Sequence, residues 1–174
     1  MSRAFVREDD LEARGEFEGP ERPLPPRPIL ITAEGRLALE QRIAELEEEE
    51  AALADPDEDL ASESARQSLQ RERRWIENVL AAASTPLPEN REQVGFGAWV
   101  TVEDPEGEKQ CYRLVGEVEA DPKTGAISWR SPLGRALLDS KVGDLVTWRR
   151  PAGEIELEIL AIDWEDPGKA ASAS

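Results

Sequence analysis

Nine carboxylates crowd a stretch of fifteen residues, 45–59, that contains no lysine and no arginine. Carboxylate oxygens are hard ligands that suit Mg²⁺, but Mg²⁺ keeps several waters and binds weakly to an isolated pair of protein carboxylates. These acids therefore predict metal chemistry only if a partner supplies the ion and further ligands. The candidates lie at and just beyond a turn marked by proline, and they are Asp55, Asp57, Glu58, Asp59 and Glu63.

Two local explanations of the acids stay open beside the metal interpretation. Residues 47–50 are four consecutive glutamates, and runs of like charge on a helix usually face solvent. Asp55 fits the N-cap of a second helix, with Pro56 as its first residue and Glu58 as the capping-box acid. Capping leaves Asp57 and Asp59 without a role.

Composition excludes several classes of site. The chain has 174 residues, a net charge of −17, no histidine and one cysteine. Zinc sites and most nucleophile-base pairs need histidine or further cysteines, so an independent hydrolase is not favoured. The net charge also argues against direct DNA binding, which needs clustered lysine and arginine to displace counterions from phosphates, and a basic protein surface is the better partner for so acidic a chain.

The sequence also favours a cytoplasmic protein. Cys111 has no second cysteine with which to form an internal disulfide, and Asp9, Asp10 and Glu12 interrupt any signal segment. No apolar run approaches the roughly 18 residues that a membrane span needs, so we expect no membrane association.

Two helical stripes predict an antiparallel coiled-coil hairpin over residues 29–85. After Thr32, a good N-cap, the first stripe contains Leu39, Ile43, Leu46 and Leu53. A second stripe follows Pro56, and Pro86 and Pro88 end it because they lack the backbone donor that a continuing helix uses. Its members are Leu69, Ile76, Val79, Leu80 and Ala83.

The remaining segments read differently. Residues 1–28 are rich in charge and proline, and we expect a flexible arm, with residues 86–93 as a linker and residues 166–174 as a flexible tail.

Between the linker and the tail, residues 94–165 show alternation of period two with turn formers at 104–107, 121–125 and 151–153. The pattern predicts an antiparallel sheet with a short helix near residues 135–139, so the fold class is α+β. Five tryptophans are expected to be core or half-buried.

The ordered motifs of this second half resemble a known family. They are residues 112–116 (Tyr-Arg-Leu-Val-Gly), 117–121 (Glu-Val-Glu-Ala-Asp), 125–128 (Gly-Ala-Ile-Ser), 131–138 (Ser-Pro-Leu-Gly-Arg-Ala-Leu-Leu) and 142–144 (Val-Gly-Asp). Together they resemble the carboxy-terminal domain of the bacterial GreA/GreB transcript-cleavage factors. The resemblance implies an FKBP-like fold for this domain, without prolyl isomerase activity, because none of the motifs identifies that active site.

The same resemblance implies a function. Members of the family bind bacterial RNA polymerase, insert the hairpin into its secondary channel and use two tip acids to help hold a Mg²⁺ of the polymerase. The hydrolysis is then the polymerase's own reaction. We expect a noncatalytic regulator of transcription elongation with no cofactor of its own and, at most, a shared Mg²⁺.

The tip departs from the family pattern, Gly-Asp-Leu-Ser-Glu-Asn-Ala-Glu-Tyr. Here residues 59–65 read Asp-Leu-Ala-Ser-Glu-Ser-Ala, so Ser62 takes the place of the second acid and Glu63 comes one residue later. The hairpin is also about one heptad shorter than the family's. True cleavage activity, modulation without cleavage, and binding of a basic protein other than polymerase all remain as alternatives.

Two further surfaces are implied by the resemblance. A basic face of the second helix, which in the family contacts nascent RNA, equally fits ion pairs with the first helix; its residues are Arg66, Arg71, Arg73 and Arg74. A docking site at the rim of the channel, or simply a turn that the fold requires, is assigned to Ser131, Pro132, Leu133, Gly134, Arg135 and Leu137.

Overall fold

The structure is a computed structural model that describes residues 21–53 and 60–168. The described residues divide into two compact units. The hairpin unit contains residues 21–24 and 39–81, and the sheet unit contains residues 25–38 and 82–168. The first turns of the first long helix therefore belong to the sheet unit, and its remainder belongs to the hairpin unit.

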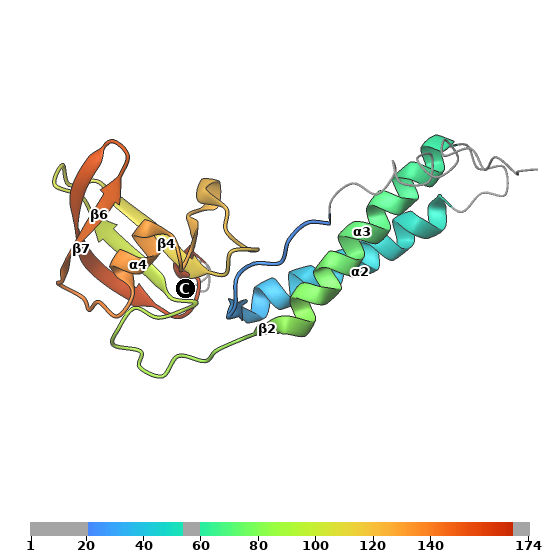
Figure 1. The fold of residues 1–174 in the computed structure, drawn as a ribbon. Coiled ribbons are helices and arrows are strands. Elements are labelled where there is room, and N and C mark those ends of the chain that lie inside the picture. The colour runs from blue at the N-terminus through green and yellow to red at the C-terminus, as the bar shows by residue number, and fades with distance from the viewer. Residues whose placement is uncertain (1–20, 54–59, 169–174) are drawn as a thin grey trace, which may run out of the picture. The chain divides into compact units, whose positions relative to one another are not determined.

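Two long helices, α2 (Ala33–Ala52) and α3 (Leu60–Ala82), lie side by side (Figure 1). Thr32 caps α2 as predicted, because its Oγ1 accepts a hydrogen bond from Gly35 N at 3.0 Å. Leu46, Ile76 and Val79 of the predicted stripes are buried. The predicted helical hairpin is confirmed.

Short strands flank the hairpin. β1 (Ile29–Leu30) pairs in parallel with β2 (Ala83–Ser84), and Ile31 N donates to Ser84 O at 3.0 Å. Ile29 and Ile31 are fully or almost fully buried. The chain before α2 and the chain after α3 are thus tied together within the sheet unit. Among the described residues, no helix is long and apolar enough to cross a membrane.

The sheet unit is built on five strands in the order β5-β4-β3-β7-β6. Their bounds are β3 (Trp99–Glu103), β4 (Lys109–Val115), β5 (Ala126–Ser128), β6 (Leu145–Arg150) and β7 (Gly153–Asp163). Three of the four pairings are antiparallel, but β4 and β5 run parallel. The α+β class is confirmed, and the sheet is mixed instead of wholly antiparallel. Residues 116–125, with the 3-10 turn η1 (Pro122–Thr124), provide the crossover that a parallel pair requires.

Aspartates close the turns of the sheet by accepting bonds from nearby backbone donors. Asp104 accepts from the N–H groups of residues 106 and 108, Asp121 caps η1, and Asp144 accepts from Lys141 N at 2.8 Å. The core is made of side chains from the sheet and from the short helix α4 (Pro132–Leu137). Val100, Leu114, Leu137 and Ile159 are among its members, each at 0% exposure. All five tryptophans are half-buried, as predicted.

Candidate functional site

The acidic end of the hairpin is described only in part. Asp55, Asp57, Glu58 and Asp59 lie outside the described residues. Glu63 lies in the first turn of α3, where its exposed carboxylate accepts a bond from Gln67 Nε2 at 3.4 Å. Within residues 21–53 and 60–168, no three acids, histidines or cysteines gather in a way that could hold a metal ion.

Part of the acidic run on α2 is paired inside the hairpin. Arg42 contacts Glu72 of α3 at 3.0 Å and also reaches Glu49 at 2.9 Å and Glu45 at 3.4 Å. The hydrogen bonds to Glu72 and then Glu49 raise the pKa of the Arg42 guanidinium above its ordinary value. One arginine therefore offsets the repulsion among several glutamates that would otherwise oppose the helix.

The four arginines of α3 do not share one role. Arg73 points to α2, where it contacts Glu50 at 2.9 Å, and it also contacts Glu77 at 2.8 Å. The bond to Glu50 and then that to Glu77 raise the pKa of Arg73. This is the ion pair between the two helices that the sequence left as an alternative to RNA contact. Arg66 lies half-buried near the start of the helix.

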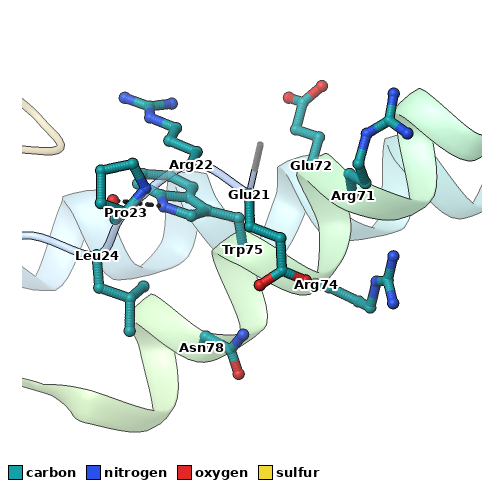
Figure 2. A pocket seen from close by; sticks show the side chains of 9 residues that line it. All are labelled: Glu21, Arg22, Pro23, Leu24, Arg71, Glu72, Arg74, Trp75 and Asn78. Carbon is teal, nitrogen blue, oxygen red and sulfur yellow. Dashed lines mark hydrogen bonds between the residues drawn. The ribbon is translucent and has the colours of Figure 1, made fainter. Parts of the chain in front are cut away.

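Arg71 and Arg74 lie elsewhere, beside Trp75, on a surface that residues 21–24 also line (Figure 2). Arg71 is half-buried, and its Nη2 donates to Ser68 Oγ at 3.0 Å. Arg74 is exposed, and none of the carboxylates in the described part of the chain pairs with it. The predicted basic face is thus divided, because Arg73 pairs with α2 whereas Arg71 and Arg74 border an open surface.

The predicted docking loop is a capped helix with a buried side. Ser131 is the N-cap of α4, and its Oγ accepts from Gly134 N at 3.0 Å. Leu133 and Leu137 are buried, and a Cβ at Gly134 would come within 2.3 Å of Ser128 O. The remaining two predicted residues, Pro132 and Arg135, are exposed. Of the six predicted docking residues, these two have exposed side chains, whereas Ser131 caps the helix and Leu133, Gly134 and Leu137 are buried.

One carboxylate that the sequence did not single out organises the start of α2. Glu119 accepts hydrogen bonds from Thr32 N at 2.9 Å, from Thr32 Oγ1 and from Gly116 N at 3.1 Å. The backbone here is so close that a Cβ at Gly116 would lie 1.9 Å from Leu30 O. A negative charge at the first turn of a helix is also favoured by the helix dipole. Glu119 therefore fixes the entry into the hairpin from within the sheet unit.

A second side chain holds the segment that precedes β1. Arg130 Nη2 donates to the carbonyl oxygens of Pro26 at 3.3 Å and Pro28 at 3.1 Å. Its Nε lies 2.7 Å from Glu117 Oε1, and its guanidinium lies 4.6 Å from the ring centroid of Trp129. These two proline carbonyls precede the strand, so the arginine supplies the donors that they need.

Comparison with known proteins gives matches to one family. Residues 88–163 match the family model described as "Transcription elongation factor, GreA/GreB, C-term". The transcription elongation factor GreA of Phenylobacterium zucineum is 35% identical over 154 residues, which cover 78% of this chain and 98% of that protein. The chain belongs to the GreA/GreB family. It is accordingly a Gre-like transcription elongation factor, as the sequence motifs predicted.

Other members of the family match shorter or more distant stretches. The GreB protein of Pseudomonas aeruginosa is 41% identical over 92 residues, which cover 53% of this chain and 54% of that protein. Among solved structures, the GreA factor homolog 1 (Gfh1) of Thermus thermophilus is 27% identical and covers 79% of this chain and 99% of its own, with a TM-score of 0.39.

Proposed function

We propose that this Gre-like factor binds bacterial RNA polymerase at its secondary channel and modulates elongation with the acidic end of its α2–α3 hairpin. The similarity to a named GreA over 98% of that protein's length carries the proposal, because it spans both the hairpin and the sheet unit. The net charge of −17 supports a basic channel as the receiving surface. Any hydrolysis belongs to the polymerase, and this chain is at most an accessory.

The Mg²⁺ that the family implies is not matched by the described residues. Of the predicted tip acids only Glu63 is among them, and its carboxylate is bonded to Gln67. A single exposed carboxylate does not hold Mg²⁺ by itself. Sharing of the polymerase's Mg²⁺ thus depends on residues 55–59, which lie outside the described residues.

Contact with nascent RNA is the second element of the proposal. Arg71 and Arg74 support it, since both lie beside an aromatic ring on a surface away from the ion pair that Arg73 makes with α2. Arginine with an adjacent aromatic face is a combination that suits single-stranded nucleic acid. The contact would be transient, because two arginines neutralise few phosphates.

The test uses stalled, backtracked RNA polymerase with Mg²⁺, and it follows binding of this protein and shortening of the transcript from its 3′ end. Binding without shortening is the expected result for a modulator that occupies the channel. Faster shortening would make the protein a true cleavage factor. Absence of both would overturn the proposal and favour a basic partner other than polymerase.

A matched pair of variants separates the effect of the tip acids from the effect of the overall net charge. In D57N/E58Q/D59N three charges are removed at the predicted tip, and in E40Q/E47Q/E48Q three are removed from exposed positions of α2. If the tip acts in the channel, only the first variant changes elongation or cleavage, while binding persists in both. Equal effects would mean that overall charge, and not the tip, governs the activity.

A further inference from the structure

One face of α3 carries side chains that the buried interior of the hairpin does not use. Residues at spacings of three, one and three share a single face of a helix, and here they are Arg71, Arg74, Trp75 and Asn78. The buried side chains of α3, Ile76 and Val79, lie on another face. A large aromatic residue away from the buried positions has a role other than packing the two helices together.

The Trp75 ring is held in a fixed orientation by the segment that precedes β1 (Figure 2). Its Nε1 donates a hydrogen bond to the carbonyl oxygen of Pro23 at 3.2 Å. The Arg22 guanidinium lies 3.9 Å from the centroid of the ring. Nucleobases stack on aromatic side chains and on guanidinium planes alike. The ring and the guanidinium together are therefore a ready surface for a base.

A pocket of about 610 Å³ adjoins this ring, and residues 21–24 and α3 line it (Figure 2). Small-molecule sites commonly have volumes of roughly 300–1,000 Å³. Leu24 adds an apolar side chain to the lining, and Asn78 adds an amide that both donates and accepts hydrogen bonds. The lining thus suits one flat ring system with polar edges.

The pocket is positively charged, although the net charge of the chain is −17. Its charged lining consists of three arginines and two glutamates, namely Arg22, Arg71, Arg74, Glu21 and Glu72. The Glu72 carboxylate is also engaged by Arg42 of α2 at 3.0 Å, which offsets its charge. Guanidinium groups match the oxygens of a phosphate in geometry and in charge. The pocket therefore attracts a phosphate group.

We propose that this pocket binds a single nucleotide, with the base stacked on Trp75 and the phosphates on Arg71 and Arg74. One ring stacks one base, and two arginines neutralise one or two phosphates and not a strand. A free nucleotide and the terminal nucleotide of an RNA present the same groups. The binding rests on the pocket alone, and only a role in holding the transcript rests on the proposed function.

ADP tests the phosphate contacts by calorimetric titration into the full-length protein, without polymerase or Mg²⁺. R71A/R74A is expected to bind ADP about tenfold more weakly than wild type, because the guanidinium partners of the phosphates are lost. The matched control R91A/R149A removes two exposed arginines of the sheet unit and should bind ADP as wild type does. Equal weakening in both double variants would mean attraction by net charge and would overturn the site.

The stacking of the base is tested at the ring. W75L keeps an apolar side chain and should bind ADP about tenfold more weakly than wild type, whereas W75F keeps a flat ring and should stay within about threefold. Pyrophosphate, which has no base, should bind W75L and wild type equally, and this also checks that W75L retains the folded site. Binding of ADP to W75L as tight as to wild type would overturn stacking on Trp75.

A labelled twelve-nucleotide single-stranded RNA distinguishes the two sources of the nucleotide. RNA binding that excess ADP displaces, and that R71A/R74A and W75L both weaken, would assign the site to an RNA end. ADP binding without such RNA binding would assign it to a free nucleotide. If neither ligand binds wild type more tightly than R71A/R74A, the proposal is overturned. Since polymerase and the tip acids take no part, this failure is distinct from failure of channel binding.

Discussion

Glu119 and Thr32 are 87 residues apart in the sequence, yet the Glu119 carboxylate accepts hydrogen bonds from both the backbone N–H and the hydroxyl of Thr32. Thr32 Oγ1 in turn accepts from Gly35 N, so the cap of α2 is itself held by the sheet unit. An ion pair between Arg113 and Glu34, at 2.8 Å, also joins the sheet to the first turn of α2. The start of the hairpin is thus set by the sheet unit and not by helix propensity alone.

Replacing Glu119 by glutamine should destabilise the protein. Glutamine keeps one acceptor but turns an amide toward N–H donors, and loss of charge-assisted bonds at a partly buried site costs about 1–3 kcal/mol. Urea unfolding monitored by circular dichroism measures the change. The control is E106Q, whose side chain is exposed at a turn, and which should stay within about 0.5 kcal/mol of wild type. Equal stability of E119Q and E106Q would contradict the role assigned to Glu119.

The sequence pattern predicted those elements whose signals lie within a few neighbouring residues. Thr32 as a cap, the valines of β3 and the aspartates of the turns were all evident, because each depends on neighbours within a few residues. β5 was not predicted, since three residues of Ala-Ile-Ser are too short to show alternation. Its parallel register depends on a crossover that no local signal encodes.

The candidate site residues also include some that the local sequence predicted and others whose partners depend on long-range packing. Arg73 and Arg74 are adjacent in the sequence, but packing of α3 on α2 directs Arg73 to Glu50 and leaves Arg74 exposed. The contact of Trp75 with Pro23 spans 52 residues, and that of Glu119 with Thr32 spans 87. Long-range partners of this kind depend on the folded topology and not on composition, so the Glu-Val-Glu motif was evident from the sequence while the groups that it holds were not.

The interior of the hairpin offers a direct test of its packing. Leu46 is fully buried, whereas Leu37 on the same helix is 65% exposed. L46A should cost about 2–5 kcal/mol because a cavity replaces a buried side chain. L37A removes the same atoms from solvent and should change stability by less than about 0.5 kcal/mol. Thermal unfolding followed at 222 nm distinguishes the two, and similar losses would mean that Leu46 is not in the seam.

The thiol of Cys111 should ionise at a higher pH than an ordinary cysteine thiol. Cys111 is exposed at the surface, but partial desolvation of its thiol raises its pKa, a hydrogen bond from Thr101 lowers it, and the charges of Asp163 and Asp166 raise it. A raised pKa in the folded state means that this group adds stability below its ordinary pKa of about 8.5 and that the contribution is lost as pH rises. The rate of iodoacetamide labelling against pH should therefore have a higher midpoint in native protein than in urea. D163N should lower the native midpoint, and coincident midpoints in the two states would contradict a raised pKa of the Cys111 thiol in the folded protein.

A substitution at one charged residue can test whether α4 is a docking surface for polymerase. Arg135 is exposed in the last turn of α4, while Leu137 in the same turn is fully buried in the core. R135E should weaken binding to RNA polymerase by about tenfold, because a reversed charge at a rim contact costs on the order of 1.4 kcal/mol, and its melting temperature should stay close to that of wild type. L137A should instead lower the melting temperature by several degrees. Unchanged affinity of R135E, measured by surface-immobilised polymerase at two salt concentrations, would remove α4 from the interface and leave Ser131 and its neighbours as structural parts of the fold.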